Sequence, residues 1–239
     1  MFAKDKLSKE KRVLSVAFDY SSGDFRMVLS ADGALLADVE EKLPIRRFAA
    51  SISIIVGALE SIGAEVADVR RWTCGTGPGG FTALRASAAL AMGLASRGGE
   101  NGRAVSARGV PSVAALGAEL AELRPDAETA AVLYDAKGGG VIRCALERRD
   151  GVMRPVEGDG FAAKVANPER LVAFDALVAY STERVSLESA LPGIDGVEWL
   201  ERFPVERLLD FPEYPWGEGL DSPLYLRPST DAKPYAWKK

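Results

Sequence analysis

The residues with the clearest chemical potential form a glycine-rich segment, G-T-G-P-G-G-F-T-A-L-R, at positions 75–85. Glycine adopts positive φ and lets another backbone come close, so four glycines around Pro78 indicate a tight turn between two regular elements. In α/β proteins such turns hold phosphates, because the free N–H groups at a helix start attract anions. They also occur where two elements simply pack closely. The segment is therefore either an anion-binding loop or a structural turn.

The segment matches no complete nucleotide-binding motif. The Walker pattern places a Lys and then a Ser or Thr after its second glycine, whereas Gly80 is followed by Phe81 and Thr82. Three of the glycines have G-x-G-x-x-G spacing, but a dinucleotide site also needs an acidic residue about 20 positions further on to bind the ribose. The nearest candidate, Glu100, lies in a second glycine-rich turn. Dinucleotide binding is therefore disfavoured.

Other catalytic arrangements are sparse. The chain contains no His, which excludes His-based acid–base catalysis and His metal sites. Asp19 and Asp135 each follow an apolar run, where a carboxylate can serve a nucleotide and its Mg²⁺ or can stabilise a turn by accepting N–H bonds. Ser21, Ser22 and Ser112 have no evident base beside them and are predicted to be turn and helix-start residues. We expect no catalytic residue, cofactor or metal.

Composition excludes several classes of protein. The chain has 239 residues, of which 47% are hydrophobic and 27% charged, as in globular proteins. A formal net charge of −4 argues against a protein that binds nucleic acid without a partner, because phosphate contacts need a basic surface. No apolar run approaches the ~18 residues of a membrane span, and the first twelve residues lack a signal core. We therefore expect a cytoplasmic protein, with Cys74 and Cys144 as buried thiols.

The order of elements follows from hydrophobic periodicity. Strands are predicted at 13–18, 25–29 (half-exposed), 35–41, 70–74 and 104–107, with helices at 48–62, 82–96 and 112–123. A second unit begins near Asp126, with strands at 130–134, 141–146 and after 151, followed by helices and loops to residue 211. We predict an N-terminal domain at 12–125 and a C-terminal domain at 126–239.

The two helices on either side of the fourth strand form a candidate interface. The second carries no charge from Ala86 to Ser96, and a helix that is apolar on every side must be covered on every side. Either the domain's own core or another protein chain can provide that cover. The candidate interface residues are Phe48, Ile52, Ile55, Leu59, Leu84, Ala88 and Ala91.

The glycine segment resembles the G-x-G-P-G-S-F-T-G-x-R signature of the TsaB family, also called YeaZ. The residues that carry this resemblance are Gly75, Gly77, Pro78, Gly79, Gly80, Phe81, Thr82 and Arg85. Weaker similarities occur in the family's order at 13–21, 110–113, 134–137 and 223–227. The resemblance therefore extends from about residue 12 to the C-terminal region.

The resemblance implies a two-lobed actin-like ATPase (ribonuclease H-like) fold, α/β in class, with a mixed five-stranded sheet and helices in the N-terminal lobe. It also implies a non-catalytic subunit that supports threonylcarbamoyl transfer to adenosine 37 of tRNA. The implied partners are a TsaD-like catalytic subunit, which the two helices would contact, and a TsaE-like ATPase, with tRNA engaged only indirectly. A homodimer is an alternative state. An independent ATP-using enzyme of the actin-like class is the alternative function, with Asp19 as its candidate residue.

The chain departs from the family pattern at several positions. Gly80 stands where the family has Ser, and Ala83 where it has Gly. The family's usual His near the first helix is absent, since the chain reads Arg-Arg-Phe at 46–48. The chain therefore resembles a divergent member.

Overall fold

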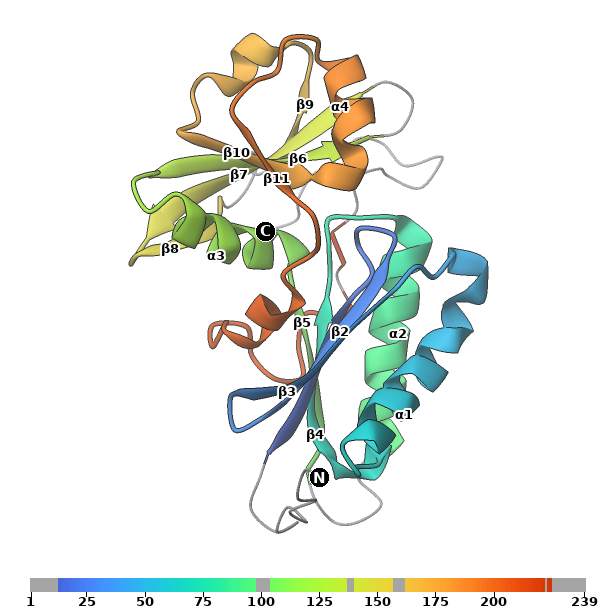
Figure 1. The fold of residues 1–239 in the computed structure, drawn as a ribbon. Coiled ribbons are helices and arrows are strands. Elements are labelled where there is room, and N and C mark those ends of the chain that lie inside the picture. The colour runs from blue at the N-terminus through green and yellow to red at the C-terminus, as the bar shows by residue number, and fades with distance from the viewer. Residues whose placement is uncertain (1–12, 98–103, 137–139, 157–161, 222, 225–239) are drawn as a thin grey trace, which may run out of the picture.

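The computed structural model describes residues 13–97, 104–136, 140–156, 162–221 and 223–224. Two sheets, each flanked by helices, form two lobes one above the other (Figure 1). This arrangement confirms the predicted two-lobed α/β fold. Within the described residues, no helix is both long and apolar enough to cross a membrane.

The first lobe contains the predicted mixed sheet of five strands, in the order β3-β2-β1-β4-β5. The strands are β1 (Leu14–Asp19), β2 (Phe25–Ala31), β3 (Ala34–Glu41), β4 (Val69–Gly75) and β5 (Ser106–Val110). The β1, β4 and β5 strands are parallel, whereas β2 and β3 form an antiparallel hairpin against β1. The carboxyl ends of the three parallel strands therefore meet at one edge of the sheet.

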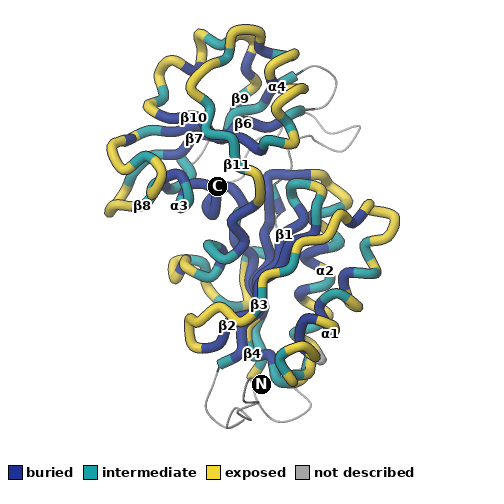
Figure 2. Tube along the Cα trace, viewed as in Figure 1, coloured by how far each residue is buried: buried dark blue, intermediate teal, exposed yellow. Residues whose placement is uncertain are grey.

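Helices cover one face of this sheet, with α1 over β2 and α2 over β4 (Figure 1). The elements on this side are η1 (Ile45–Ala50), α1 (Ser51–Ser61), η2 (Val66–Asp68) and α2 (Phe81–Arg97). The sides of α1 and α2 that face the sheet are buried, and their outer sides are largely exposed (Figure 2). Each helix is therefore amphipathic in burial, although α2 is nearly uniform in composition.

The second lobe repeats the topology of the first, in the order β8-β7-β6-β10-β11, with β9 also paired to β7. Its strands are β6 (Thr129–Asp135), β7 (Val141–Arg149), β8 (Val152–Pro155), β9 (Ala162–Val165), β10 (Ala176–Tyr180) and β11 (Val197–Leu200). In each lobe the first strand is central: β1 is antiparallel to β2 and parallel to β4, and β6 is antiparallel to β7 and parallel to β10. The two halves of the chain are thus copies of one fold.

Short helices flank the second sheet. Its helical elements are α3 (Ser112–Leu123), η5 (Pro168–Leu171), η6 (Ser181–Glu183) and α4 (Arg184–Ala190). The α3 helix packs against β8, and α4 packs against β6. The bounds of α3 match the predicted range of 112–123.

After the second lobe the chain returns to the first. The segment around η7 (Val205–Leu209) contacts β1, β2, β4 and α3, on the face of the first sheet opposite α1 and α2. The strand predicted at 25–29 is present as β2, but its predicted half-exposure is wrong, since every residue of β2 is buried between two layers. Alternating polar and apolar residues indicate a solvent-exposed strand face only when one face of the sheet is uncovered.

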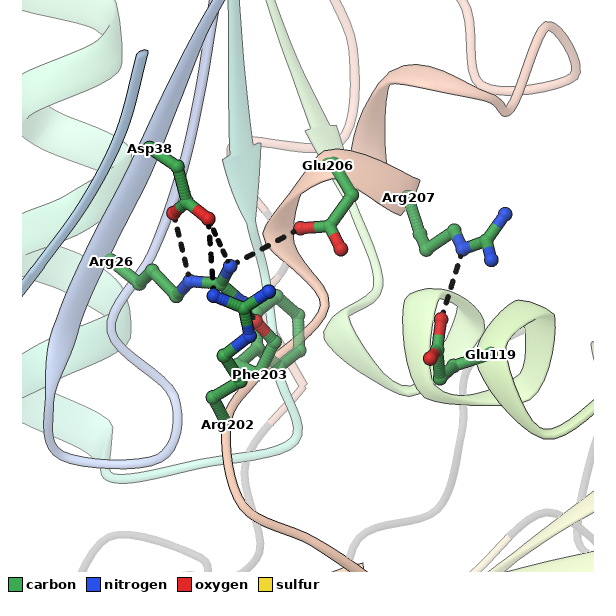
Figure 3. Close-up of polar contacts among 7 residues, drawn as sticks. All are labelled: Arg26, Asp38, Glu119, Arg202, Phe203, Glu206 and Arg207. Carbon is green, nitrogen blue, oxygen red and sulfur yellow. Dashed lines mark hydrogen bonds and ion pairs between the residues drawn. The ribbon is translucent and has the colours of Figure 1, made fainter. Parts of the chain in front are cut away.

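Two buried arginines of the first sheet hold the returning segment. The Arg26 guanidinium donates to the carbonyl oxygen of Phe203 and pairs with Asp38, at 3.2 and 2.7 Å (Figure 3). The Arg108 guanidinium, on β5, donates to the carbonyl oxygens of Phe211 at 2.5 Å and Tyr214 at 3.0 Å. Each arginine satisfies backbone acceptors that would otherwise be buried without a donor.

The prediction for the region after 156 is correct in its helices but misses three strands. Helices and loops were expected there, yet β9, β10 and β11 are strands. The β10 and β11 strands pair in parallel with distant partners, so no turn signal in the adjacent sequence marks them. The strand predicted at 104–107 is β5, which starts and ends later, at Ser106–Val110. The division at residue 126 stays a prediction.

Candidate functional site: the glycine loop and the helix it starts

The glycine loop begins at Gly75, the last residue of β4, beside the end of β1. A Cβ atom on Gly75 would lie 1.8 Å from Oδ2 of Asp19 and 2.8 Å from Oγ of Ser112. No side chain fits in that space, because real Cβ atoms do not approach other atoms so closely. Glycine is therefore required at position 75 by packing against a carboxylate, independently of any ligand.

The first amides of the loop are already bonded to protein acceptors. The N–H of Thr76 donates to the carbonyl oxygen of Val110 at 2.8 Å, and the N–H of Gly77 donates to Oγ of Ser112 at 2.9 Å. Pro78, which follows a cis peptide bond, has no N–H. A phosphate cradle needs free N–H groups that converge on one point. The structural turn is therefore the better interpretation of this loop.

Asp19 lies beneath the loop and is fully buried. Its Oδ1 accepts bonds from the N–H and the Oγ of Ser21, at 2.7 and 2.6 Å. Its Oδ2 accepts a bond from Oγ of Ser112 at 2.5 Å. Burial raises the pKa of this carboxyl group, and the bonds from Ser112 and Ser21 oppose that rise. Asp19 thus has the geometry of a turn-stabilising residue, and two of the three serines that lacked an evident partner in the sequence, Ser21 and Ser112, donate their hydroxyls to it.

Close backbone contacts hold the rest of the loop. Gly77 has a φ of +98°, and a Cβ there would lie 2.5 Å from the carbonyl oxygen of Leu224. The N–H of Leu224 in turn donates to the carbonyl oxygen of Thr76 at 2.7 Å. A Cβ on Gly79 would lie 2.9 Å from the backbone of Ser21. The loop therefore joins three distant parts of the chain.

The loop ends by starting α2. The carbonyl oxygen of Gly80 accepts the N–H of Leu84 at 3.0 Å, so Gly80 occupies the N-cap position. Phe81, Thr82 and Arg85 follow on the exposed side, where the Arg85 guanidinium lies 4.2 Å from the centroid of the Phe81 ring. These three predicted motif residues are thus at the surface together with Gly80, whereas Gly75, Gly77 and Gly79 are buried.

The predicted interface residues fall into two groups. Five are buried in the first lobe's own core: Ile55, Leu59, Leu84, Ala88 and Ala91. Phe48 is half-buried, with its ring centroid 5.2 Å from that of Tyr20, whereas Ile52 is 49% exposed. For the first five the burial favours the alternative that they form the core of the lobe.

Large apolar side chains remain exposed on the same helical layer. They are Ile45 on η1, Ile52 on α1, and Phe81 and Met92 on α2, exposed by between 38% and 55%. Phe81, Arg85, Ala89, Met92 and Ser96 are exposed and spaced three or four residues apart, as one face of a helix requires. We call this surface, made of Ile45, Ile52, Phe81 and Met92 with the exposed residues around them, the outer helical face.

Metal and thiol chemistry find no support in the described residues. No group of three or more potential ligands is placed to hold a metal ion. Cys74 and Cys144 are buried free thiols, and burial raises the pKa of both.

Asp135, the other aspartate that follows an apolar run, lies at the end of β6. Its backbone N–H donates to Oε2 of Glu183 at 2.8 Å, which bonds this strand end to η6.

Comparison with known proteins depends on structure alone, because the chain matches no protein-family model and no curated protein. The structure of YeaZ from Pseudomonas aeruginosa aligns with a TM-score of 0.61 and 23% identity, over 82% of this chain and 89% of that one. The fold is that of YeaZ. A structure described as an uncharacterized protein with similarity to peptidase YEAZ from P. aeruginosa gives a TM-score of 0.62 and 24% identity, over 83% and 89%.

The YeaZ fold and the glycine signature agree with each other. In the sequence, the composition singled out α2 and the glycine loop carried the resemblance to YeaZ. The structure shows that the loop leads directly into α2. Sequence reasoning missed the exposed Met92 on α2 and Ile45 on η1. Met92 could have been found in the sequence, because counting from Phe81 in steps of three or four residues along the predicted helix reaches it.

Proposed function

We propose that this chain is a non-catalytic partner subunit of the enzyme that transfers threonylcarbamoyl to adenosine 37 of tRNA. It binds the catalytic, TsaD-like subunit through the outer helical face. The observation that carries the proposal is the coincidence of the YeaZ fold with an exposed apolar layer on the two helices beside the glycine signature. The TsaE-like ATPase and tRNA are engaged through that complex, in the cytoplasm.

The state of the strand ends supports a non-catalytic role. A nucleotide site of the open α/β type lies at the carboxyl ends of parallel strands. Here the Asp19 carboxylate at that edge is buried and bonded to two serines, and the first loop amides donate to protein acceptors. The alternative of an independent ATP-using enzyme would need these groups to be free.

The interface can be tested with charge substitutions on exposed residues. We expect Ile52→Glu and Met92→Glu each to weaken binding of the catalytic subunit by tenfold or more, because a charge in an apolar contact is desolvated without a partner. Val185→Glu is the matched control, since Val185 is 82% exposed on the other lobe. Thermal unfolding should be unchanged in all three variants. Equal binding by all of them would refute this face as the interface.

Two further measurements address the function itself. Wild-type protein should restore threonylcarbamoyladenosine in the tRNA of cells depleted of their own TsaB, and Met92→Glu should restore less. The isolated chain should neither bind nor hydrolyse labelled ATP. Tight ATP binding by the chain alone would favour the enzyme alternative instead.

A further inference from the structure

Two tyrosines stand at the edge of the second sheet that faces the first lobe. Tyr134 is near the end of β6 and Tyr180 is the last residue of β10, the neighbouring parallel strand. Both belong to the core cluster that also contains Ala17 and Val28 of the first sheet. Their side chains therefore lie in the layer where the two lobes meet.

The phenol groups of both tyrosines are buried without a protein partner. Among the described residues, neither hydroxyl oxygen has a hydrogen-bond partner, although each is inaccessible to solvent. A buried hydroxyl without a partner costs about 1–3 kcal/mol of desolvation. Native proteins usually meet such a cost with an ordered water that makes about three hydrogen bonds.

The neighbours of these hydroxyls define what can bind. Carboxylates of Asp19 and Glu183 lie close enough to raise the pKa of both phenols, after burial as the main cause. The Ser21 hydroxyl approaches Tyr180 and lowers its pKa, without completing a hydrogen bond of normal geometry. The parallel register of β6 and β10 places Tyr134 beside Tyr180. The core cluster that holds both tyrosines also contains residues of the first turn of α3, which begins at Ser112, the donor to Asp19. The two phenol donors of the second lobe therefore lie near acceptor oxygens at the end of β1.

The charges exclude an ion as the occupant. The nearby carboxylates oppose an anion. Both oxygens of Asp19 already accept bonds from serines, and Oε2 of Glu183 accepts the N–H of Asp135, which leaves too few free anionic ligands for a desolvated cation. A neutral molecule that both accepts and donates hydrogen bonds fits these groups.

We propose that a single water molecule binds between the lobes, accepting hydrogen bonds from Tyr134 and Tyr180 and donating to oxygens of the Asp19–Ser21 turn. The water joins the carboxyl ends of the first strands of both sheets. It holds the lobes together at the edge where related open sheets bind ligands. This site is independent of the outer helical face and of the proposed function.

Replacing either tyrosine by phenylalanine changes the stability in opposite directions, depending on whether the water is bound. It destabilises the fold if the phenol donates to a water, and leaves it unchanged or more stable if the phenol has no partner. If the water binds, Tyr134→Phe and Tyr180→Phe each lower the folding equilibrium constant about three- to tenfold in urea titrations, the usual effect of a lost hydrogen bond. The double variant loses less than the product of the two, because both phenols hold one molecule. Tyr20→Phe is the positive control, since the buried Tyr20 hydroxyl donates directly to the carbonyl oxygen of Leu43.

A crystal structure of the wild-type protein provides the direct measurement. The expected result is a density peak within hydrogen-bond distance of both phenol oxygens. The proposal is overturned if that density is absent or has the short distances of a metal ion. It is equally overturned if the tyrosine variants are as stable as wild type, or more stable, while Tyr20→Phe is destabilised.

Discussion

The two lobes have one strand order but use the ends of their strands differently. In the first lobe the fourth strand ends in Gly75, which lets the Asp19 carboxyl group lie against the backbone. In the second lobe the corresponding strand, β10, ends in Tyr180, whose ring lies in the layer between the lobes. With the same topology, the strand end of the first lobe makes a tight turn into a long helix. The strand end of the second lobe places a buried aromatic ring between the lobes. Strand order specifies where a site can form, and the terminal side chain decides what forms there.

The helical layers differ in the same way. The first lobe carries the 17-residue α2, with an exposed apolar side, whereas α4 in the second lobe has 7 residues. The returning segment covers the second face of the first sheet, where Arg26 and Arg108 hold it. The first lobe is therefore the one that carries an exposed apolar helical surface. The comparison can be tested with substitutions in each lobe separately.

The largest expected effect is at Gly75. Gly75→Ala places a methyl group within 1.8 Å of the Asp19 carboxylate, so we expect a loss of about 3 kcal/mol or more in unfolding free energy, or failure to fold. Gly93→Ala in α2 is the matched control, because nothing lies within 4 Å of its Cβ position. That variant should gain about 0.5–1 kcal/mol of helix propensity. Urea denaturation measures both, and a neutral Gly75→Ala would contradict the packing argument.

The next effect concerns the returning segment. Arg108→Met removes the donor for several buried carbonyl oxygens, including those of Phe211 and Tyr214, and should cost about 2–4 kcal/mol. Hydrogen exchange should rise at residues 205–218 before the second sheet is affected. Arg202→Ala provides the control, since Arg202 pairs with Asp38 while 60% exposed and should change stability by less than about 1 kcal/mol. Uniform loss of protection in both lobes would show that the segment is not a local anchor.

Two aspartates should give opposite pH dependence. Burial raises the folded-state pKa of Asp19, so its protonated form stabilises the fold below the unfolded pKa, and that contribution is lost as pH rises through the folded value. In the second lobe, hydrogen bonds from Thr129 and Glu128 lower the pKa of Asp175. Its contribution is present above the unfolded pKa and is lost as pH falls through the folded value.

The test compares Asn variants over pH 3–8 by chemical denaturation. Relative to wild type, Asp19→Asn should remove a decline in stability with rising pH, and Asp175→Asn should remove a decline with falling pH. Shifts of the same sign in both variants would mean that the environment of Asp19 is not governed by burial.

The smallest expected effect is at Gly80, the N-cap of α2. Gly80→Ser introduces a capping hydroxyl where a Cβ meets only Ala83, at 3.9 Å, and should raise unfolding free energy by a few tenths of a kcal/mol. Differential scanning calorimetry can detect this against Gly151→Ser, which should be destabilising because Gly151 has a φ of +78°. A destabilised Gly80→Ser would mean that the loop geometry differs from the signature's.

Much of the fold was readable in the sequence because its signals are local. A continuous apolar run marked β1, Pro111 preceded α3, and glycines marked the turn after β4. The glycine signature also pointed to YeaZ, whose fold the structure bears out at 23% identity. These features depend on backbone preference and periodicity, which a few neighbouring residues determine.

Contacts between distant residues decided the rest. Only the tertiary structure brings Ser112 to Asp19, lays the segment after Phe203 over β2, and pairs β10 with β6. It also decides that Ile55 and Ala91 are core while Met92 is surface, since α2 is apolar on all sides and composition alone cannot orient it. The sequence by itself determined the order of the elements and the tight turn. Burial and partners were set by packing between distant segments, such as those of Arg26 and Phe203, 177 residues apart, which no local pattern records.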